Sequence, residues 1–355
     1  MSESGKSEKE KYVELINSLR NRRVPDNPDL FTCGSQAKKI YGIVMKELTD
    51  TINNNNELTV RVVAGTFGAG KSHLVFRVIN EIWYDFRDSV LISAIDVNYA
   101  NSFADMLEQI LQRLRTREGK HLGEIVCEIG GHLASTFSLT RREKLRNTML
   151  EGVVTKEKLY RKLIEFEFTA EIAEKLSECI TKNHSSEVIG IVTKDIDCLK
   201  ALFRLLHSNS YRGICVFLDE FETLDVKSDK QSMLDMLRTL HEAGGNFRST
   251  FMLVLTREVF WSKVKDLCQP LHERWNSGRT LELTELEADD IQELFEKLLL
   301  VYEKAGYPIK HANTDEIRRE VKEIYDGLKP LGLSRTFRAV INIAIEKVEQ
   351  NWVLL

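Results

Sequence analysis

A glycine-rich run from Gly65 to Ser72 reads GTFGAGKS and matches the pattern G-x-x-x-x-G-K-[ST] in full. It lies between a short apolar run and a helical pattern, which is the strand–loop–helix context that a phosphate-binding loop requires. Glycines permit the tight turn around an anion, and the N–H groups at the helix start face the phosphates. A chance glycine turn is the alternative, which average composition produces about once in a hundred chains of this length.

Within this loop, Lys71 is expected to reach the β- and γ-phosphates and Ser72 to ligate Mg²⁺ through its hydroxyl. His73 adjoins the loop and is included with it, although packing of a helix residue on the sheet explains its side chain more simply than catalysis. The residues expected to contact ATP in this region are Gly65, Thr66, Phe67, Gly68, Ala69, Gly70, Lys71, Ser72 and His73.

An acidic pair, Asp219 and Glu220, directly follows the apolar run Cys215–Leu218. Carboxylates at the carboxyl end of a parallel strand point into the crevice where ligands bind. Asp219 is therefore expected to hold Mg²⁺ through water, and Glu220 to polarise the attacking water. A polar turn after a buried strand explains the pair equally well by itself. Together with the loop, the pair favours nucleotide hydrolysis over phosphotransfer to a small metabolite.

Several residues further along the chain are candidates for completing such a site. Thr256 ends the next apolar run, where a hydroxyl would orient the γ-phosphate or the water, although a threonine can simply end a strand. Arg274 and Arg279 precede a short strand, and we favour Arg274 as the group that reaches a neighbouring subunit's γ-phosphate. Arg335 and Arg338 begin the last helix, and we favour Arg335 as the residue that closes onto the nucleotide. An ordinary surface arginine is the alternative for each.

Short apolar runs alternate with helical patterns, and this alternation predicts an α/β fold with a parallel sheet covered by helices on both faces, as in a P-loop NTPase. A further strand is expected between the two strands that carry the motifs. Strands are predicted at 58–65, 90–97, 214–222, 251–256 and 280–283, and core helices at 71–86, 102–115, 195–208, 230–243 and 258–266.

Four regions are predicted along the chain. The polar residues 1–10 read as a disordered arm, and residues 11–57 as N-terminal helices that lead into the core. Residues 58–287 form the ATPase core, with a helical insertion at about 116–190 where strand patterns are missing. After Glu287 every pattern is helical, so residues 288–355 are expected to form a helical lid.

Composition limits the classes of protein that remain. Of the 355 residues, 43% are hydrophobic and 29% are charged, which excludes a wholly disordered chain, a collagen and a membrane protein. The six cysteines form no CxxC pair, so zinc and a disulfide framework are not expected, and the compartment reads as cytoplasmic. Residues 111–162 are basic and are a candidate duplex-DNA contact, for which a solvated helical face is the simpler explanation.

Four motifs, GTFGAGKS, VFLDEFE, FMLVLT and GLSRTFRA, together resemble those of the AAA+ class of ATPases. Within that class the chain resembles the ATP-binding proteins of BREX phage-defence systems (the BrxC/BrxD-type group). That likeness rests on the segments LRNRRVP, FTCG, GTFGAGKSHL, LDEFETL, LRTLHEAG and RTFRAVINIAIEKV. The resemblance implies an AAA+/ASCE-type sheet and Mg²⁺-dependent ATP hydrolysis in a multi-protein complex acting on or near DNA.

The sequence thus predicts a cytoplasmic ATPase that acts as a switch or motor in a phage-defence complex. We expect it to form a homo-oligomer or a hetero-complex, and we expect no membrane as a partner. One alternative resembles the origin-recognition ATPases, replication initiators that carry a winged-helix DNA reader after the lid; beyond the lid helix we expect no room for one. The other is a nucleotide-bound scaffold with negligible turnover, against which the intact Asp219 and Glu220 argue.

Overall fold

A parallel sheet lies at the centre of the computed structural model, which describes residues 7–21, 34–135, 151–193, 196–276, 280–328 and 335–354. Within these residues the sheet has five strands in the order β2-β3-β4-β1-β5. The bounds are β1 Thr59–Gly65, β2 Val90–Asp96, β3 Gly213–Asp219, β4 Thr250–Thr256 and β5 Leu281–Leu283. The predicted extra strand between the motif-bearing β1 and β3 is β4, which confirms that expectation.

The register brings the carboxyl ends of the central strands together. Ala64 of β1 is paired with Thr256 of β4, and Asp96 of β2 with Asp219 of β3. All pairings are parallel, so the loops that follow β1, β3 and β4 leave the sheet at the same edge. The glycine-rich loop and the acidic pair therefore emerge at one edge of the sheet.

Helices cover both faces of the sheet, which explains why its strands read as continuous apolar runs. Val63, Phe217 and Leu253 pack on one face under two helices, α2 Ser35–Asn53 and α3 Lys71–Asp85. Val62 and Val216 pack on the other face. The helices there are α4 Phe103–Arg113, α10 Ile196–Ser208, α11 Lys230–Glu242, α12 Glu258–Leu267 and α13 Gln269–Trp275.

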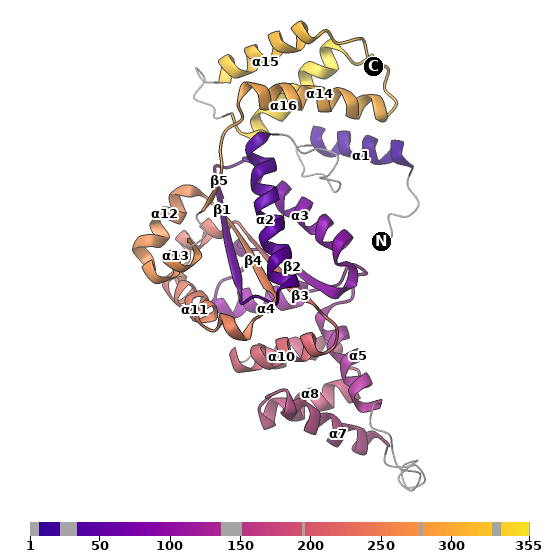
Figure 1. Ribbon diagram of the computed structural model, residues 1–355, viewed down its shortest axis with the longest axis vertical. Coiled ribbons are helices and arrows are strands. Elements are labelled where there is room, and N and C mark those ends of the chain that lie inside the picture. Colours follow the sequence, from indigo (N-terminus) through magenta and orange to yellow (C-terminus); the bar gives the residue numbers. More distant parts are fainter. Residues whose placement is uncertain are drawn as a thin grey trace.

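A helical lid lies at the end of the molecule drawn uppermost in Figure 1. It contains α14 Ala288–Lys304, α15 Thr314–Leu328 and α16 Phe337–Asn351, as the sequence predicted. A helix from the start of the sequence, α1 Glu8–Arg20, packs on the same apolar core through Tyr12, Leu15, Ile16 and Leu19. Only α2 leads into the sheet, so α1 is placed differently from the expectation for residues 11–57.

Helix α1 also begins earlier than the sequence suggested, because Glu8–Glu10 are helical although residues 1–10 were expected to be a disordered arm. Ser7 and Glu10 form a capping box: the Ser7 hydroxyl accepts from the Glu10 N–H at 3.3 Å, and the Glu10 carboxylate accepts from the Ser7 N–H at 2.7 Å. Polar composition indicated disorder here, but Ser-x-x-Glu before an apolar run is a helix-start signal.

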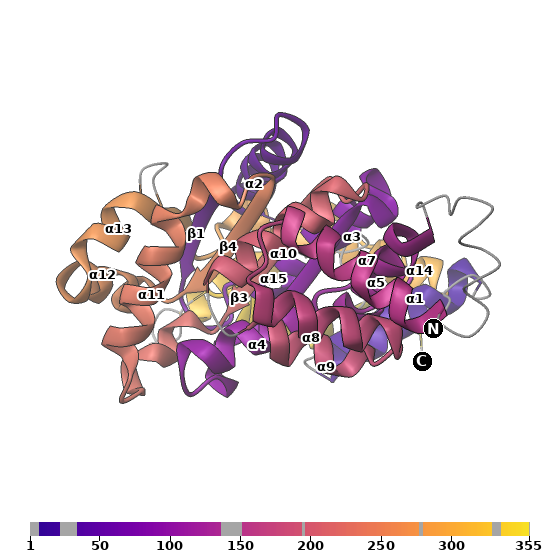
Figure 2. The same cartoon turned by 90° about the horizontal axis from the view of Figure 1, so that it is seen from below.

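A group of helices projects from the opposite end of the sheet, at the bottom of Figure 1, and faces the viewer in Figure 2. Its members are α5 Leu122–Ser135, α7 Glu151–Glu165, α8 Ala170–Thr181 and α9 Ser185–Val192. They occupy the region predicted as a helical insertion, and their apolar faces join the core beneath α10. No helix of the described residues has the combination of length and apolar character that crossing a bilayer demands.

Candidate nucleotide-binding site

The glycine-rich loop connects β1 to α3 and is shaped by two glycines with positive φ. Gly68 has φ 80° and Gly70, the residue before α3, has φ 97°, a region that other residues enter at a cost. A Cβ at position 68 would lie 2.9 Å from the Cβ of Arg338, so a side chain has no room there. The first N–H groups of α3 lack intrahelical partners and are suited to bind an anion.

Lys71 lies against the loop. Its Nζ donates hydrogen bonds to the carbonyl oxygens of Gly65 at 2.8 Å and of Thr66 at 3.1 Å. Burial lowers the pKa of Lys71, an effect that the charges of Glu222 and Asp219 oppose. Phosphate oxygens are stronger acceptors than these carbonyls, so an anion in the loop would attract the ammonium group.

The two predicted motifs meet at Ser72 and Asp219. The Ser72 hydroxyl donates to Oδ2 of Asp219 at 2.6 Å, and the backbone N–H of Glu220 donates to Oδ1 at 2.9 Å. Burial raises the pKa of Asp219, while both hydrogen bonds and the charge of Lys71 act in the opposite direction. The acidic pair therefore lies beside the loop, as its position after β3 predicted.

These oxygens fit Mg²⁺, a hard cation that usually takes only one or two protein carboxylates and completes its shell with water and phosphate oxygens. No group of three or more His, Cys, Asp or Glu able to hold a metal occurs among the residues that the structure describes. A serine hydroxyl and one carboxylate suit a metal that takes its remaining ligands from water and from a bound phosphate.

Glu220 turns sharply out of β3. Its backbone is left-handed, with φ 55° and ψ 35°, and the Thr223 hydroxyl donates to its carbonyl oxygen at 2.7 Å. For a residue other than glycine this conformation costs on the order of 1 kcal/mol, and such strain is concentrated at functional sites. Burial raises the pKa of the Glu220 carboxyl, with further contributions from Glu222 and Asp219, which improves it as a base near neutral pH.

The loop, the acidic residues and the lid enclose one cavity. The loop forms its floor and Asp219, Glu220 and Glu222 form one wall. The lid side is contributed by α16 and by Leu19 of α1. The cavity residues that the sequence did not indicate are Leu19, Glu222, Phe337, Ile341 and Asn342.

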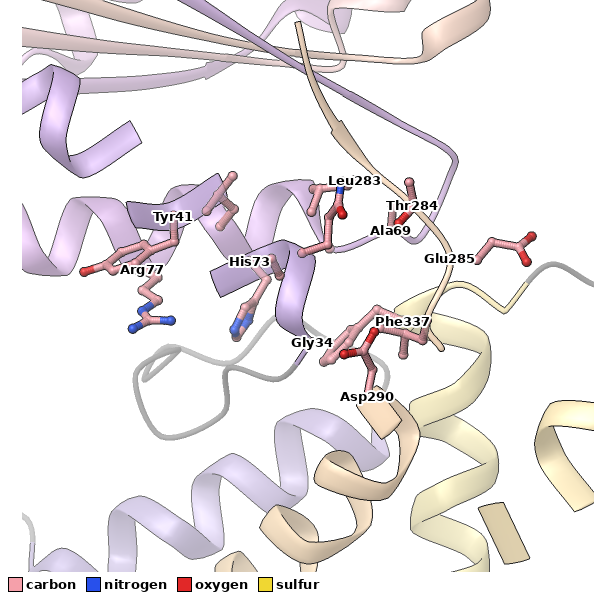
Figure 3. Close-up of a pocket in the computed structure, with 15 residues that line it drawn as sticks. Gly34, Tyr41, Ala69, His73, Arg77, Leu283, Thr284, Glu285, Asp290 and Phe337 are labelled. Carbon is pink, nitrogen blue, oxygen red and sulfur yellow. The ribbon is translucent and has the colours of Figure 1, made fainter. Parts of the chain in front are cut away.

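A second, mainly apolar hollow adjoins this cavity and shares Ala69, Gly70, His73 and Phe337 with it. Figure 3 shows Tyr41, Arg77 and His73 on the sheet side, with Phe337 and Asp290 on the lid side. The rings of His73 and Phe337 are stacked, with centroids 5.9 Å apart, and the Arg77 guanidinium lies 3.8 Å from the centre of the Tyr41 ring. Flat, aromatic surfaces therefore line this hollow.

Among the further candidates, Thr256 is fully buried at the end of β4, between the two motif strands, and its hydroxyl has no hydrogen-bond partner among the described residues. Arg335 is held outside both hollows: its Nε donates to Glu285 at 3.2 Å and its guanidinium lies 4.1 Å from the centre of the Tyr325 ring. The structure thus does not bring Arg335 to the loop, in contrast to our expectation.

Arg338, the arginine that we did not favour, lines the cavity. Its backbone N–H donates to the carbonyl oxygen of Gly68 at 3.0 Å, and its guanidinium lies 4.7 Å from the centre of the Phe67 ring. Thr336 caps the start of α16, because its hydroxyl accepts from the Ala339 N–H at 3.4 Å. Through the Arg338–Gly68 hydrogen bond, this capped start contacts the loop. This arrangement turns Arg338 toward the loop.

The finger candidates and the basic region lie elsewhere. Arg274 of α13 forms an ion pair with Glu242 of α11 and does not line this chain's cavity, whereas Arg279 falls outside the described residues. In the basic stretch, Arg113 and Arg117 donate to backbone carbonyl oxygens at 3.3 and 3.4 Å. Of the other basic residues in that stretch, Arg115 lies over the Trp83 ring and Lys120 forms an ion pair with Glu128. The remaining members fall outside the described residues: Arg141, Arg142, Lys144 and Arg146.

The sheet order, the phosphate loop after β1, the acidic end of β3 and the helical lid define a P-loop fold of the AAA+ type. No protein-family model matches the chain, and no curated protein matches it by sequence.

Comparison with solved structures finds matches of low similarity over most of this chain. The ORC2 protein of Aeropyrum pernix matches with 13% identity and a TM-score of 0.44 over 88% of this chain and 66% of that chain. Cdc6p from Pyrobaculum aerophilum matches with 12% identity and a TM-score of 0.44 over 91% of this chain and 60% of that chain. The chain therefore spans less than two thirds of the length of either protein. The ORC1 protein of Aeropyrum pernix, solved in complex with DNA, matches with 10% identity and a TM-score of 0.40. That match covers 94% of this chain and 70% of the ORC1 chain.

Proposed function

We propose that this protein binds ATP together with Mg²⁺ and hydrolyses it. The observation that carries the proposal is the 2.6 Å hydrogen bond between Ser72 and Asp219, which joins a complete phosphate loop to an acidic strand end. Glu220 lines the same cavity, so the groups that bind phosphate, hold a metal and activate water lie together.

In this proposal the triphosphate lies on the loop, where the N–H groups of α3 and the ammonium group of Lys71 bind its oxygens. The base lies in the adjoining hollow, against the stacked His73 and Phe337 and near Tyr41. The two hollows share residues, so one nucleotide fills both, and α16 contacts both its base and its phosphates.

Each side chain then has a chemical task. Mg²⁺, when bound through Ser72 and Asp219, neutralises charge on the phosphates. Glu220 orients a water for in-line attack on the γ-phosphorus and accepts its proton. The unpartnered hydroxyl of Thr256 donates to the γ-phosphate or to that water. Arg338 binds phosphate from the lid side, so the lid responds to the loss of the γ-phosphate.

For the larger role, we propose a nucleotide-driven switch or motor in a DNA-associated, multi-protein phage-defence complex. Its support is the likeness of motifs to the BREX ATP-binding proteins, which extends from LRNRRVP near the start of the sequence to the lid helix, apart from residues 116–190. Arg274 fits a finger supplied to a second subunit, because it lies outside its own cavity and half exposed on α13.

Two substitutions test the hydrolase. Lys71→Ala removes the cation that pairs with the phosphates, so ATP binding should fall at least about a hundredfold. Glu220→Gln keeps the shape of the site but not the base, so bound ATP should persist while turnover falls at least about a hundredfold. Nucleotide binding and phosphate release, each with and without duplex DNA, are the measurements.

If the Lys71→Ala protein hydrolyses ATP at the wild-type rate, the assignment is wrong. If the wild type binds ATP but releases no phosphate under any condition, a nucleotide-bound scaffold explains the site better. Lys263→Ala on the exposed side of α12 serves as the control, because Lys263 pairs with Asp225 and neither residue lines the cavity.

A further inference from the structure

Phe67 of the phosphate loop is an exposed aromatic side chain that has no task in the mechanism above. It lies between β1 and α3, lines the phosphate cavity and is 58% exposed. Large apolar side chains that are scattered singly on a surface need no explanation. Phe67 differs from these, because two arginine side chains from distant parts of the sequence lie beside its ring.

One of these cations comes from the sheet and already has a carboxylate partner. Arg257 directly follows β4, and its guanidinium lies 5.9 Å from the centre of the Phe67 ring. Its Nε donates to Oε1 of Glu222 at 2.9 Å, and the side chain of Glu222 is only 11% exposed. A largely buried carboxylate therefore orients Arg257, whatever the ring contributes.

The other cation comes from the lid and lacks such a partner. The guanidinium of Arg338 lies 4.7 Å from the centre of the Phe67 ring, and it forms no ion pair or hydrogen bond with any residue that the structure describes. The backbone of Arg338 is held separately, by the hydrogen bond from its N–H to the carbonyl oxygen of Gly68. The ring is thus the contact that orients the Arg338 side chain.

A guanidinium that lies over a ring can still bind an anion. The ring attracts the cation through its aromatic face, whereas the five N–H donors of a guanidinium lie in its own plane and point outward from its edge. Phe67 belongs to the loop on which we propose that the phosphates lie, and Arg338 lines the same cavity. Arg338 can therefore remain on the ring while its donors contact phosphate oxygens.

Packing of a core does not account for the ring. Among the described residues Phe67 belongs to none of the three apolar clusters, whereas Phe337, in the same cavity, packs on the apolar core of the lid. Replacing the Phe67 ring should therefore leave the stability of the nucleotide-free protein nearly unchanged. A loss of nucleotide binding would then come from the site and not from the fold.

We propose that Phe67 is the positioning residue for Arg338, whose guanidinium its ring holds over the phosphate loop before a nucleotide arrives. This inference rests on the proposed function, in which Arg338 binds phosphate from the lid side. Arginine has a long side chain with many rotamers, and ordering it in advance lowers the free-energy cost of binding ATP.

The test measures how tightly the full chain binds a non-hydrolysable ATP analogue with Mg²⁺, by calorimetry. Phe67→Leu keeps an apolar side chain but removes the aromatic face, so the dissociation constant should rise about three- to tenfold. Phe67→Tyr restores the face and can turn its hydroxyl to solvent, so binding should stay within about twofold of the wild type. Phe76→Leu is the matched control, since Phe76 is exposed on α3 and lines neither hollow.

A double-mutant cycle shows whether the ring acts through Arg338. Arg338→Gln removes the cation, so adding Phe67→Leu to that variant should weaken binding by less than about twofold more. Thermal unfolding without nucleotide should place Phe67→Leu within about 2 °C of the wild type, as for other exposed side chains. A larger shift would mean that the ring supports the fold, which contradicts the inference.

The outcomes are distinguishable. An equal loss from Phe67→Leu with and without Arg338, a loss that Phe67→Tyr shares, or no loss at all overturns the role of the ring while leaving the ATP site in place. If the wild-type protein does not bind the ATP analogue, the proposed function itself is wrong and this inference falls with it.

Discussion

At the scale of single residues, the site contains charges that oppose folding. Asp219 is largely buried, and burial raises the pKa of its carboxyl above that of the unfolded chain. The folded state therefore binds the proton more tightly, so this group contributes less stability as pH rises from the unfolded value through the raised value. At neutral pH the ionised carboxylate is a cost to the fold, which bound Mg²⁺ and nucleotide would offset.

Asp219→Asn should accordingly stabilise the nucleotide-free protein at neutral pH, by on the order of 1 kcal/mol, because it removes a buried charge and keeps an acceptor for the Glu220 N–H. It should also abolish the stabilisation that Mg²⁺ and ATP give the wild type. Urea unfolding at pH 7 and at acid pH is the measurement. The gain should shrink toward acid pH, as the wild-type carboxyl takes up its proton.

Asp225→Asn provides a control of opposite sign. The hydrogen bond from Lys263 lowers the pKa of Asp225, so its ionised form stabilises the fold above the unfolded value and that contribution is lost as pH falls through the lowered value. The variant should therefore be no more stable than the wild type at neutral pH. If both variants were stabilised equally, the explanation from burial of Asp219 would be wrong.

The same scale shows what the sequence reveals about a site and what it does not. Lys71, Ser72 and the acidic pair could be predicted because their spacing follows from the phosphate loop and the strand end. Glu222 and Arg257 lie in a turn and at a helix start, where charged residues are ordinary, and only the fold brings them together. No sequence pattern records such a contact between two loops.

At the scale of elements, the start of α16 is pressed against the phosphate loop. The N–H of Arg338 donates to the carbonyl oxygen of Gly68. This close approach is possible because glycine has no side chain to collide with Arg338. Arg335 and Arg338 are three residues apart, and the sequence could not show which faces the loop, because the rotation of a helix about its axis is set by packing. The lid is thus coupled to the loop through a backbone contact, before any contribution from the nucleotide that we propose binds there.

Gly68→Ala tests this coupling. The new methyl group would meet Arg338 and would be held at a positive φ, so stability should fall by about 1–2 kcal/mol and ATP binding should weaken. Thermal unfolding with and without ATP measures both. Gly42→Ala in α2, where nothing lies within 4 Å, should instead stabilise the protein by up to about 1 kcal/mol. Similar effects from both changes would contradict the close approach.

At the scale of the whole molecule, α1 completes the lid. Its apolar face packs among α14 and α16, its Tyr12 hydroxyl accepts from Lys304 at 2.9 Å, and Arg20 pairs with Glu349 at 2.6 Å. An amphipathic helix can be predicted from its periodicity, but periodicity does not say which apolar surface it covers. The strand boundaries, in contrast, were predicted to within one residue, because buried β-branched runs end where the chain leaves the core. The exception is the end of β3, which was expected at residue 222 but lies at Asp219, because the chain turns at Glu220 into a short helix, Phe221–Val226.

Ile16→Ala should therefore destabilise the lid rather than the sheet. Removing a side chain that is 1% exposed should lower the free energy of unfolding by about 2–4 kcal/mol and reduce the thermal shift produced by ATP, because the lid closes the cavity. Hydrogen exchange should show the loss of protection in α14 and α16. Asn17→Ala on the exposed face of α1 is the control, and equal effects of the two would refute the docking.

Because α1 packs on the lid, it must wait during synthesis for partners that come much later in the chain. Arg20 leaves the ribosome long before Ala288 is made, and at roughly 5–20 residues per second the interval amounts to tens of seconds. Throughout that time the apolar face of α1 lacks the lid helices on which it packs, while the sheet and its helical insertion can already fold. Until α14, α15 and α16 have been synthesised, a nascent chain thus exposes the apolar face of α1, and chaperone binding would be concentrated there.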